Sequence, residues 1–184
     1  AAPVRLVALD QEGKELAWTG DVRSVSAKPH LAEVQAAASC PALNVEAHSA
    51  VEMDGMMKVT LKLLPVADAV PLSRLSLLIP LKDEVATVMQ EVGAHCRAGY
   101  TGAIPRLDVG ADGKAPDRGA VWTSKQTPRG SSWLNAFTSY VWMGGSERGI
   151  CWFAENDRGW ITAKNREQPL QRIIRSSGRV LLRV

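Results

Sequence analysis

Apolar and polar residues alternate along several short segments of the chain, a pattern typical of β-strands that bury one face. The clearest case lies in residues 57–63, where every odd position is Met, Val or Leu and every even position is Lys or Thr. A period of two places alternate side chains on opposite faces of a strand. Residues 57–63 therefore predict a strand with one buried apolar face and one solvated polar face.

Asp54-Gly55 lies between this strand and the preceding run of residues 45–52, and predicts a β-hairpin over residues 45–64. Asp-Gly suits the two positive φ angles of a type I′ turn. We therefore expect this turn type at the tip of the hairpin.

Residues 31–40 are rich in alanine, which favours a helix, but Pro29 and Pro41 bracket them and the neighbouring segments resemble strands. Helix propensity is a weak prior that tertiary context overrides, so we expect a strand here. Further strands are predicted at residues 4–9, 16–27, 74–82, 120–123, 134–143, 150–154, 170–174 and 180–184, the last two as a hairpin.

Many short strands separated by turn residues predict an all-β protein, an antiparallel β-sandwich with long loops and little helix that could extend to a large supersandwich. Residues 99–119 hold five glycines and two prolines and predict a long loop. Long helices at residues 31–40 or 83–92 would contradict this fold.

The composition indicates one globular domain over residues 1–184, with 46% hydrophobic and 22% charged residues. No window of about 18 residues stays apolar, so we expect no membrane partner. The net charge is +3, and the sequence shows no basic patch beside a motif that recognises nucleic-acid bases. We therefore expect no nucleic-acid partner. Because the chain stops inside an apolar strand, we expect it to be a fragment of a longer multidomain protein.

Catalytic and metal-binding motifs are missing from the sequence. The cysteines Cys40, Cys96 and Cys151 have no metal-ligand spacing, and predict buried thiols or one disulfide in an exported protein. The chain lacks the sequence motif of a hydrolase nucleophile, the glycine motif of dinucleotide binding and the motif of a phosphate-binding loop. We therefore expect no metal, no cofactor and no catalytic residue in this chain.

Aromatic residues are concentrated in one segment, with eight of the ten between residues 122 and 160. The strand at residues 150–154 has apolar side chains on both faces, so one face meets the core and the other is free to meet a ligand or another domain. We expect residues 147–160 to form a strand with flanking turns at an edge or end of the sandwich. Phe153 should face the core, and Trp152 or Trp160 should face the partner.

Charged residues frame this segment on both sides. Carboxylates and guanidinium groups beside aromatic rings bind sugar hydroxyl groups through charge-assisted hydrogen bonds, although ordinary turns explain the same residues. The candidates for a carbohydrate-binding site or a domain interface are Glu147, Arg148, Trp152, Glu155, Asp157, Arg158 and Trp160.

Residues 140–144 and 147–160, YVWMG and ERGICWFAENDRGW, resemble a signature of large bacterial proteins similar to glycoside hydrolase family 123. Weaker similarities lie at residues 53–55, 79–82 and 121–125, so the resemblance covers most of the chain from residue 45 onward. In such proteins a β-sandwich region precedes a catalytic (β/α) barrel, whose Asp-Glu pair carries substrate-assisted hydrolysis of N-acetylgalactosaminides. No part of this chain matches the barrel, so none of its catalytic residues can be placed here.

The resemblance implies a non-catalytic accessory domain of a bacterial, exported carbohydrate-active protein. Its partners would be the catalytic domain of the same polypeptide and a glycan in the cleft that it helps to line. One alternative is an independent carbohydrate-binding module. The other is a self-contained glycosidase that uses Glu147, Glu155 or Asp157 as a carboxylate pair.

Overall fold

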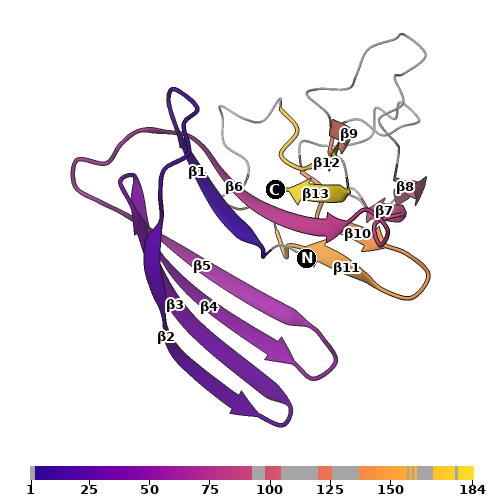
Figure 1. Ribbon diagram of the computed structural model, residues 1–184, viewed down its shortest axis with the longest axis horizontal. Helices are drawn as coiled ribbons and strands as arrows, with labels where there is room; N and C mark the ends of the chain where they lie inside the picture. Colours follow the sequence, from indigo (N-terminus) through magenta and orange to yellow (C-terminus); the bar gives the residue numbers. More distant parts are fainter. Residues whose placement is uncertain are drawn as a thin grey trace. The chain divides into compact units, whose positions relative to one another are not determined.

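The computed structural model describes residues 3–92, 98–104, 120–125, 137–156, 158, 160, 168–176 and 178–184. Within these ranges the regular secondary structure consists of β-strands, and the strand pairs described below are antiparallel. The strands are β1 (Arg5–Asp10), β2 (Thr19–Lys28), β3 (Leu31–Cys40), β4 (Leu43–Glu52), β5 (Met57–Pro65), β6 (Leu72–Lys82), β7 (Val88–Val92), β8 (Ala98–Ala103), β9 (Ala120–Thr123), β10 (Tyr140–Gly144), β11 (Gly149–Phe153), β12 (Arg172–Ser176) and β13 (Arg179–Arg183) (Figure 1).

The predicted strand at residues 31–40 is confirmed as β3, because cross-strand pairing on both sides outweighs the helix propensity of its alanines. Residues 88–92 form β7, a strand that the sequence pattern did not reveal. The loop predicted at residues 99–119 is wrong at its start, where residues 98–103 form β8. Residues 105–119 lie outside the described part of the chain.

The chain divides into two compact units, which we describe separately. Residues 6–76 form the meander unit, and residues 1–5 with 77–184 form the sandwich unit. The strand β6 runs from one unit into the other at Ser76 and Leu77. The expectation of a single domain within a longer protein stays a prediction.

The sandwich unit consists of two antiparallel sheets packed face to face, which confirms the predicted β-sandwich. One sheet contains β6, β13, β12 and β9 in that order, and the other has the order β11, β10, β7, β8. Alternate residues of both sheets meet in one core, among them Ile79, Leu182 and Ile173 from the first sheet and Met89, Val141 and Met143 from the second. Strand β11 is an edge strand, as the sequence predicted for residues 147–160.

Side-chain hydrogen bonds to the backbone complete this unit where the strands end. The buried amide of Gln171 accepts from the backbone N–H of Thr138 at 3.0 Å and donates to its carbonyl at 2.8 Å. Arg175 donates to the Asp83 carboxylate at 2.7 Å and to the carbonyl of Ile104 at 2.9 Å. Both contacts connect segments distant in sequence, so they hold loop ends against the strands.

The meander unit contains a four-stranded sheet in which β2, β3, β4 and β5 follow one another in space as in sequence (Figure 1). The hairpin predicted at residues 45–64 is confirmed, but its turn type was predicted wrongly. Gly55 donates to the carbonyl of Glu52 and has a φ of 90°, whereas Asp54 has no positive φ. This geometry is a type I turn followed by a left-handed glycine in a bulge, which needs only one residue of positive φ.

The two faces of this sheet differ sharply in chemistry. On the polar face, Glu33 lies 3.4 Å from His48 and Glu46 lies 3.6 Å from Lys62, all of them solvent-accessible. We call the opposite face the apolar meander face. Its laterally paired residues on the four strands are all uncharged. Its paired residues are Gly20, Val22, Val25 and Ala27 on β2, Ala32, Val34, Ala36, Ala38 and Cys40 on β3, Leu43, Val45, Ala47, Ser49 and Val51 on β4, and Met57, Val59, Leu61, Leu63 and Pro65 on β5.

Only one end of the apolar meander face is covered within its own unit. There Cys40, Leu43 and Val45 are buried in a small core with Ala8, against which Trp18 and Leu72 pack. Along the rest of the face the large side chains stay exposed, for example 67% of Val25 and 47% of Val59. The buried apolar face predicted for residues 57–63 is therefore wrong: the alternation is correct, but no described part of the meander unit covers it.

Candidate functional site

The outer surface of the hairpin formed by β10 and β11 gathers aromatic side chains from the two strands. Tyr140 pairs with Phe153 and Trp142 with Cys151 in the antiparallel register. Directly opposed residues of paired strands point to the same face of a sheet. Since Val141 and Met143 between them are buried in the core, these four residues point outward, and we call them the aromatic face.

Two glycines make room for the indole ring of Trp142 on this face. A Cβ atom at Gly144 would lie 2.7 Å from Cζ2 of Trp142, and one at Gly149 would lie 2.9 Å from the same atom. These distances are shorter than ordinary carbon contacts, so a side chain at either position would push the ring away. The glycines at the end of the hairpin therefore let Trp142 lie close against the sheet.

The remaining members of the aromatic face differ in exposure and are electrically neutral near pH 7. Phe153 keeps 48% of its surface exposed. Burial raises the pKa of the Tyr140 hydroxyl, and the neighbouring Cys151 raises it further. Burial also raises the pKa of the Cys151 thiol. A neutral surface of exposed aromatic rings can pack against apolar C–H groups of a sugar or a protein.

The charged candidates from the sequence lie at opposite ends of β11 and do not converge. Glu147 and Arg148 belong to the exposed turn before β11, which Gly145 closes by donating to the carbonyl of Arg148. Glu155 and Arg158 follow the strand and are exposed. Five strand residues at about 3.3 Å each separate the two groups by roughly 16 Å. Asp157 lies outside the described residues.

Of the two tryptophans proposed from the sequence, Trp152 is buried in the core and Trp160 packs against that core. Trp152 is 9% exposed and meets Phe137 edge-to-face with a centroid distance of 5.9 Å. Trp160 is partly buried, with centroids 5.9 Å from Phe137 and 5.8 Å from Trp152. These three rings form one aromatic cluster at the core, and contacts of this kind stabilise beyond their buried area.

The predicted orientation of β11 is therefore wrong, since Phe153 faces outward and Trp152 faces the core. Apolar residues occupy both faces of this strand, so its parity alone could not show which side is buried. The side of β11 that faces outward can be identified from β10. On that strand Gly144 lies on the same face as Tyr140 and Trp142, and a glycine there leaves room for the indole ring of Trp142. The assignment of the seven candidates as a binding site stays a prediction.

Titratable groups elsewhere in the described ranges do not form an evident reaction centre. Glu91 on β7 is fully buried, and in the described part of the chain no side chain donates a hydrogen bond to its carboxylate, which lies beside the backbone of Tyr100 on β8. Burial raises the pKa of Glu91 to about 7. Its neighbour Met89 on the same side belongs to the core, so the carboxyl group points into the sandwich, where a sugar has no access. Among the described residues, no cluster of His, Cys, Asp or Glu could hold a metal ion.

The prediction of buried cysteine thiols is confirmed for Cys40 and wrong for Cys151. Cys40 is a buried free thiol, as expected, whereas Cys151 is a free thiol that lies exposed on the aromatic face. Cys96 lies outside the described residues. In the described part of the chain, no helix has the length and apolar character needed to cross a membrane.

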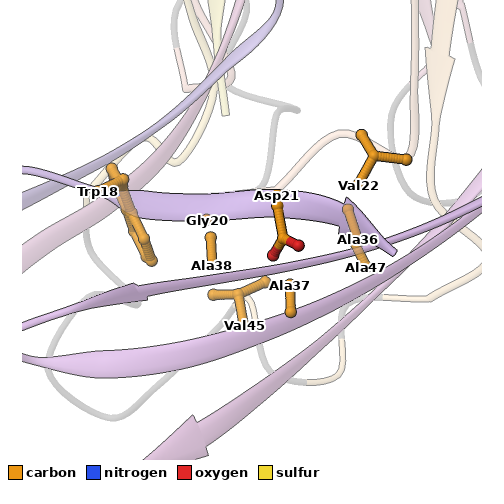
Figure 2. A pocket seen from close by; sticks show the side chains of 9 residues that line it. All are labelled: Trp18, Gly20, Asp21, Val22, Ala36, Ala37, Ala38, Val45 and Ala47. Atoms are coloured by element: carbon orange, nitrogen blue, oxygen red, sulfur yellow. The ribbon is translucent and has the colours of Figure 1, made fainter. Parts of the chain in front are cut away.

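The apolar meander face is the second candidate surface, and it contains a hollow of about 410 Å³. Trp18, just before β2, stands at one end of the hollow, and Val22 on β2 stands toward the other end (Figure 2). Three alanines, Ala36, Ala38 and Ala47, line it, and the charged Asp21 on β2 also borders it. The sequence did not reveal this surface, because alternation such as that in β5 fits both a buried face and an exposed apolar face.

Comparison with known families gave one match. Residues 1–155 match the family described as "Glycoside hydrolase 123, third domain". No curated protein and no solved structure matched the chain.

Proposed function

Because the chain belongs to the glycoside hydrolase 123 third-domain family, we propose that it is a non-catalytic β-sandwich accessory domain that supports the catalytic domain of its polypeptide. Membership in this family implies that a catalytic domain is part of the same polypeptide. The finer role, stabilising that domain and lining one wall of its cleft, is our proposal.

The separation of the carboxylates along β11 carries this proposal. Glycosidases place two carboxyl groups about 5–9.5 Å apart across the bond that they cleave. Glu147 and Glu155 lie beyond opposite ends of a five-residue strand that is itself roughly 16 Å long. The fully buried Glu91 cannot reach a substrate either. This separation argues against Glu147 and Glu155 as a catalytic pair and favours a structural role, while Asp157, the third candidate carboxylate, lies outside the described residues.

Activity measurements test the non-catalytic role. Residues 1–184 alone should not hydrolyse aryl N-acetylgalactosaminides or other aryl glycosides, whereas the complete polypeptide should do so. Turnover by the chain alone that disappears in Glu155→Gln would contradict the proposal and favour the self-contained enzyme. A complete polypeptide that keeps full activity and thermal stability after deletion of residues 1–184 would contradict a supporting role.

An independent carbohydrate-binding module is the second candidate, and the aromatic face favours it. An exposed aromatic ring on the surface of a sheet can stack on the C–H face of a sugar ring. Phe153 is the most accessible ring of this face, with 48% of its surface exposed. Glycan binding by the isolated chain that is lost in Phe153→Ala and kept in Ser146→Ala would favour this function. Absence of binding by the isolated chain at millimolar glycan favours the supporting role.

Export to the periplasm or the extracellular space stays a prediction, as does the bacterial origin that the resemblance implies. Fractionation of cells that express the complete gene would test export.

A further inference from the structure

Three of the five methionines of the chain, Met53, Met56 and Met57, lie together in the turn between β4 and β5 and at the start of β5. All three are exposed, Met53 by 82% of its surface, whereas Met89 and Met143 are buried in the core of the sandwich unit. An exposed thioether side chain buries little apolar area and so adds little to stability. Packing within the meander unit therefore does not account for this cluster.

We propose that this end of the meander sheet binds a soft monovalent metal ion, Cu(I), with the sulfur atoms of Met53 and Met57 and the imidazole of His30 as ligands. Soft thioether ligands select Cu(I), imidazole also suits copper, and hard cations such as Mg²⁺ prefer oxygen. Neither the cysteine spacing nor the absence of a His, Cys, Asp or Glu cluster from the described residues tests for such a site, because both leave thioether ligands out. The proposal is independent of the supporting function.

The backbone brings His30 next to Met53. His30 lies in the turn between β2 and β3, at the same end of the sheet as the turn between β4 and β5 (Figure 1). Leu31 pairs with Glu52, and the backbone N–H of Met53 donates to the carbonyl of His30 at 3.2 Å. His30 and Met53 therefore continue the pairing of β3 with β4 by one step, and the Cβ atoms of such opposed residues lie about 4.5–5.5 Å apart.

Strand parity selects Met57 as the third ligand. Met57 pairs with Val51, which precedes Met53 by two residues and so lies on the same face. Met53 and Met57 are thus diagonal neighbours about 7–8 Å apart. Two methionine side chains span this distance, because each is long and has three rotatable bonds. Met56 precedes Met57 by one residue and extends toward the polar face, so it is not a ligand.

The surroundings of the cluster favour an ion over an apolar protein partner. Methionine-rich surfaces also contact partner proteins, but such a contact would bury the imidazole of His30, which is costly without a hydrogen bond. In the same turn, the carboxylate of Asp54 accepts from the backbone N–H of Met56 at 2.9 Å, next to a second carboxylate on Glu52. Their negative charge attracts a cation, whereas an apolar partner would have to desolvate them.

Titration of residues 1–184 with Ag(I) in chloride-free buffer tests the site, because Ag(I) is also a soft monovalent ion and stays in one oxidation state. The chain carries Cys96→Ser and Cys151→Ser, since thiolates compete for soft ions, and its methionine methyl groups are labelled with carbon-13 for NMR. The methyl signals of Met53 and Met57 should shift, and those of Met56 and the buried methionines should stay in place. Mg²⁺ at the same concentration should shift none of them, because it prefers oxygen ligands.

Substitutions identify the ligands. Loss of an outer-shell partner of a metal ligand already weakens metal binding about 10–100-fold, so Met57→Leu and His30→Asn, each of which removes a ligand, should raise the Kd for Ag(I) at least about tenfold. Met56→Leu is the matched control, because it makes the same chemical change in the same turn, and it should leave the Kd unchanged. All three side chains are exposed, so these variants keep the fold.

Oxidation gives a second measurement. Hydrogen peroxide transfers one oxygen atom to a lone pair of the methionine sulfur and leaves as water, and a sulfur bound to Ag(I) has this lone pair engaged. Bound Ag(I) should therefore suppress sulfoxide formation at Met53 and Met57 in peptide mass spectrometry. Met56 should be oxidised at the same rate with and without the ion.

The proposal would be overturned by a methyl shift or protection of Met56 in place of Met57. The same holds if Met56→Leu and Met57→Leu bind Ag(I) with equal Kd. It would also be overturned if the methyl signals of Met53 and Met57 stay unchanged at millimolar Ag(I).

Discussion

The indole ring of Trp142 lies against the backbone of Gly149 on the neighbouring strand, so closely that a Cβ atom at Gly149 would stand 2.9 Å from its Cζ2 atom. The same Cβ would lie 2.6 Å from the carbonyl oxygen of Met143. The backbone of β10 cannot move away without breaking its pairing with β7. Gly149 thus fixes both the hairpin spacing and the position of an outward-facing aromatic ring.

Gly149→Ala should therefore destabilise the sandwich unit by roughly 1–3 kcal/mol, as for other substitutions that overfill a packed site. Trp142 should become more mobile, with a change in its fluorescence emission. Ser146→Ala in the adjacent exposed turn is the control and should change the free energy of unfolding by less than about 0.5 kcal/mol. Equal stability of the two variants in urea unfolding would contradict the close packing.

The two neighbouring aromatics of β11 should respond oppositely to truncation. Trp152→Ala removes a ring packed against Phe137 and Trp160, and should cost about 3–5 kcal/mol. Phe153→Ala removes a half-exposed ring and should cost less than about 1 kcal/mol. Urea unfolding of both variants tests this order, and a larger loss for Phe153→Ala would mean that the opposite face of β11 is buried.

The buried carboxyl group of Glu91 should make the protein less stable as the pH rises. Burial raises its pKa from 4.5 to about 7 in the folded protein, so between these values the folded state binds more protons than the unfolded state. Stability therefore falls across this window and levels off above pH 7. Glu91→Gln should remove this contribution, which amounts to at most about 3 kcal/mol.

Urea unfolding of both proteins at several pH values measures this effect. The free energy of unfolding of Glu91→Gln minus that of the unmodified protein should increase from pH 4.5 to pH 7. A difference that stays constant over this range would show that Glu91 does not titrate there.

Arg175 should be needed for stability through its contacts with the loop ends. Its side chain is mostly buried, and it binds both the Asp83 carboxylate and the carbonyl of Ile104. Arg175→Met would leave both acceptors without this donor, which should cost roughly 1–3 kcal/mol. Arg179→Met on the neighbouring strand β13 removes an exposed charge and should change stability by less than about 0.5 kcal/mol. Thermal unfolding of the pair checks the difference.

The sequence predicted strands well where apolar residues alternate and turn residues follow, as in residues 57–63 and around Asp54-Gly55. It also resolved the alanine-rich residues 31–40, whose neighbours are strands. It did not reveal β7, because the residues of β7 alternate too briefly to stand out. It predicted the wrong turn at Gly55, because Asp-Gly fits both a type I′ turn and a type I turn with a bulge.

The candidate surfaces were harder to predict because alternation identifies an apolar face but not what covers it. Val59 and Leu61 have the pattern of core residues, yet they are exposed in the meander unit. On β11 both faces are apolar, so the sequence could not decide between Trp152 and Phe153. The pairing with β10 resolves this choice, and pairing partners depend on tertiary structure.

The place of β13 in its sheet has a consequence for the time course of synthesis. This strand is the last of the described chain, yet it pairs with β6 on one side and β12 on the other. The meander strands are complete by Pro65, about 120 residues before β13 has been made. At roughly 5–20 residues per second, the ribosome needs about 6–24 s for that interval. The meander sheet thus exists for seconds before the sandwich unit can form, and its apolar face is a natural target for chaperones during translation.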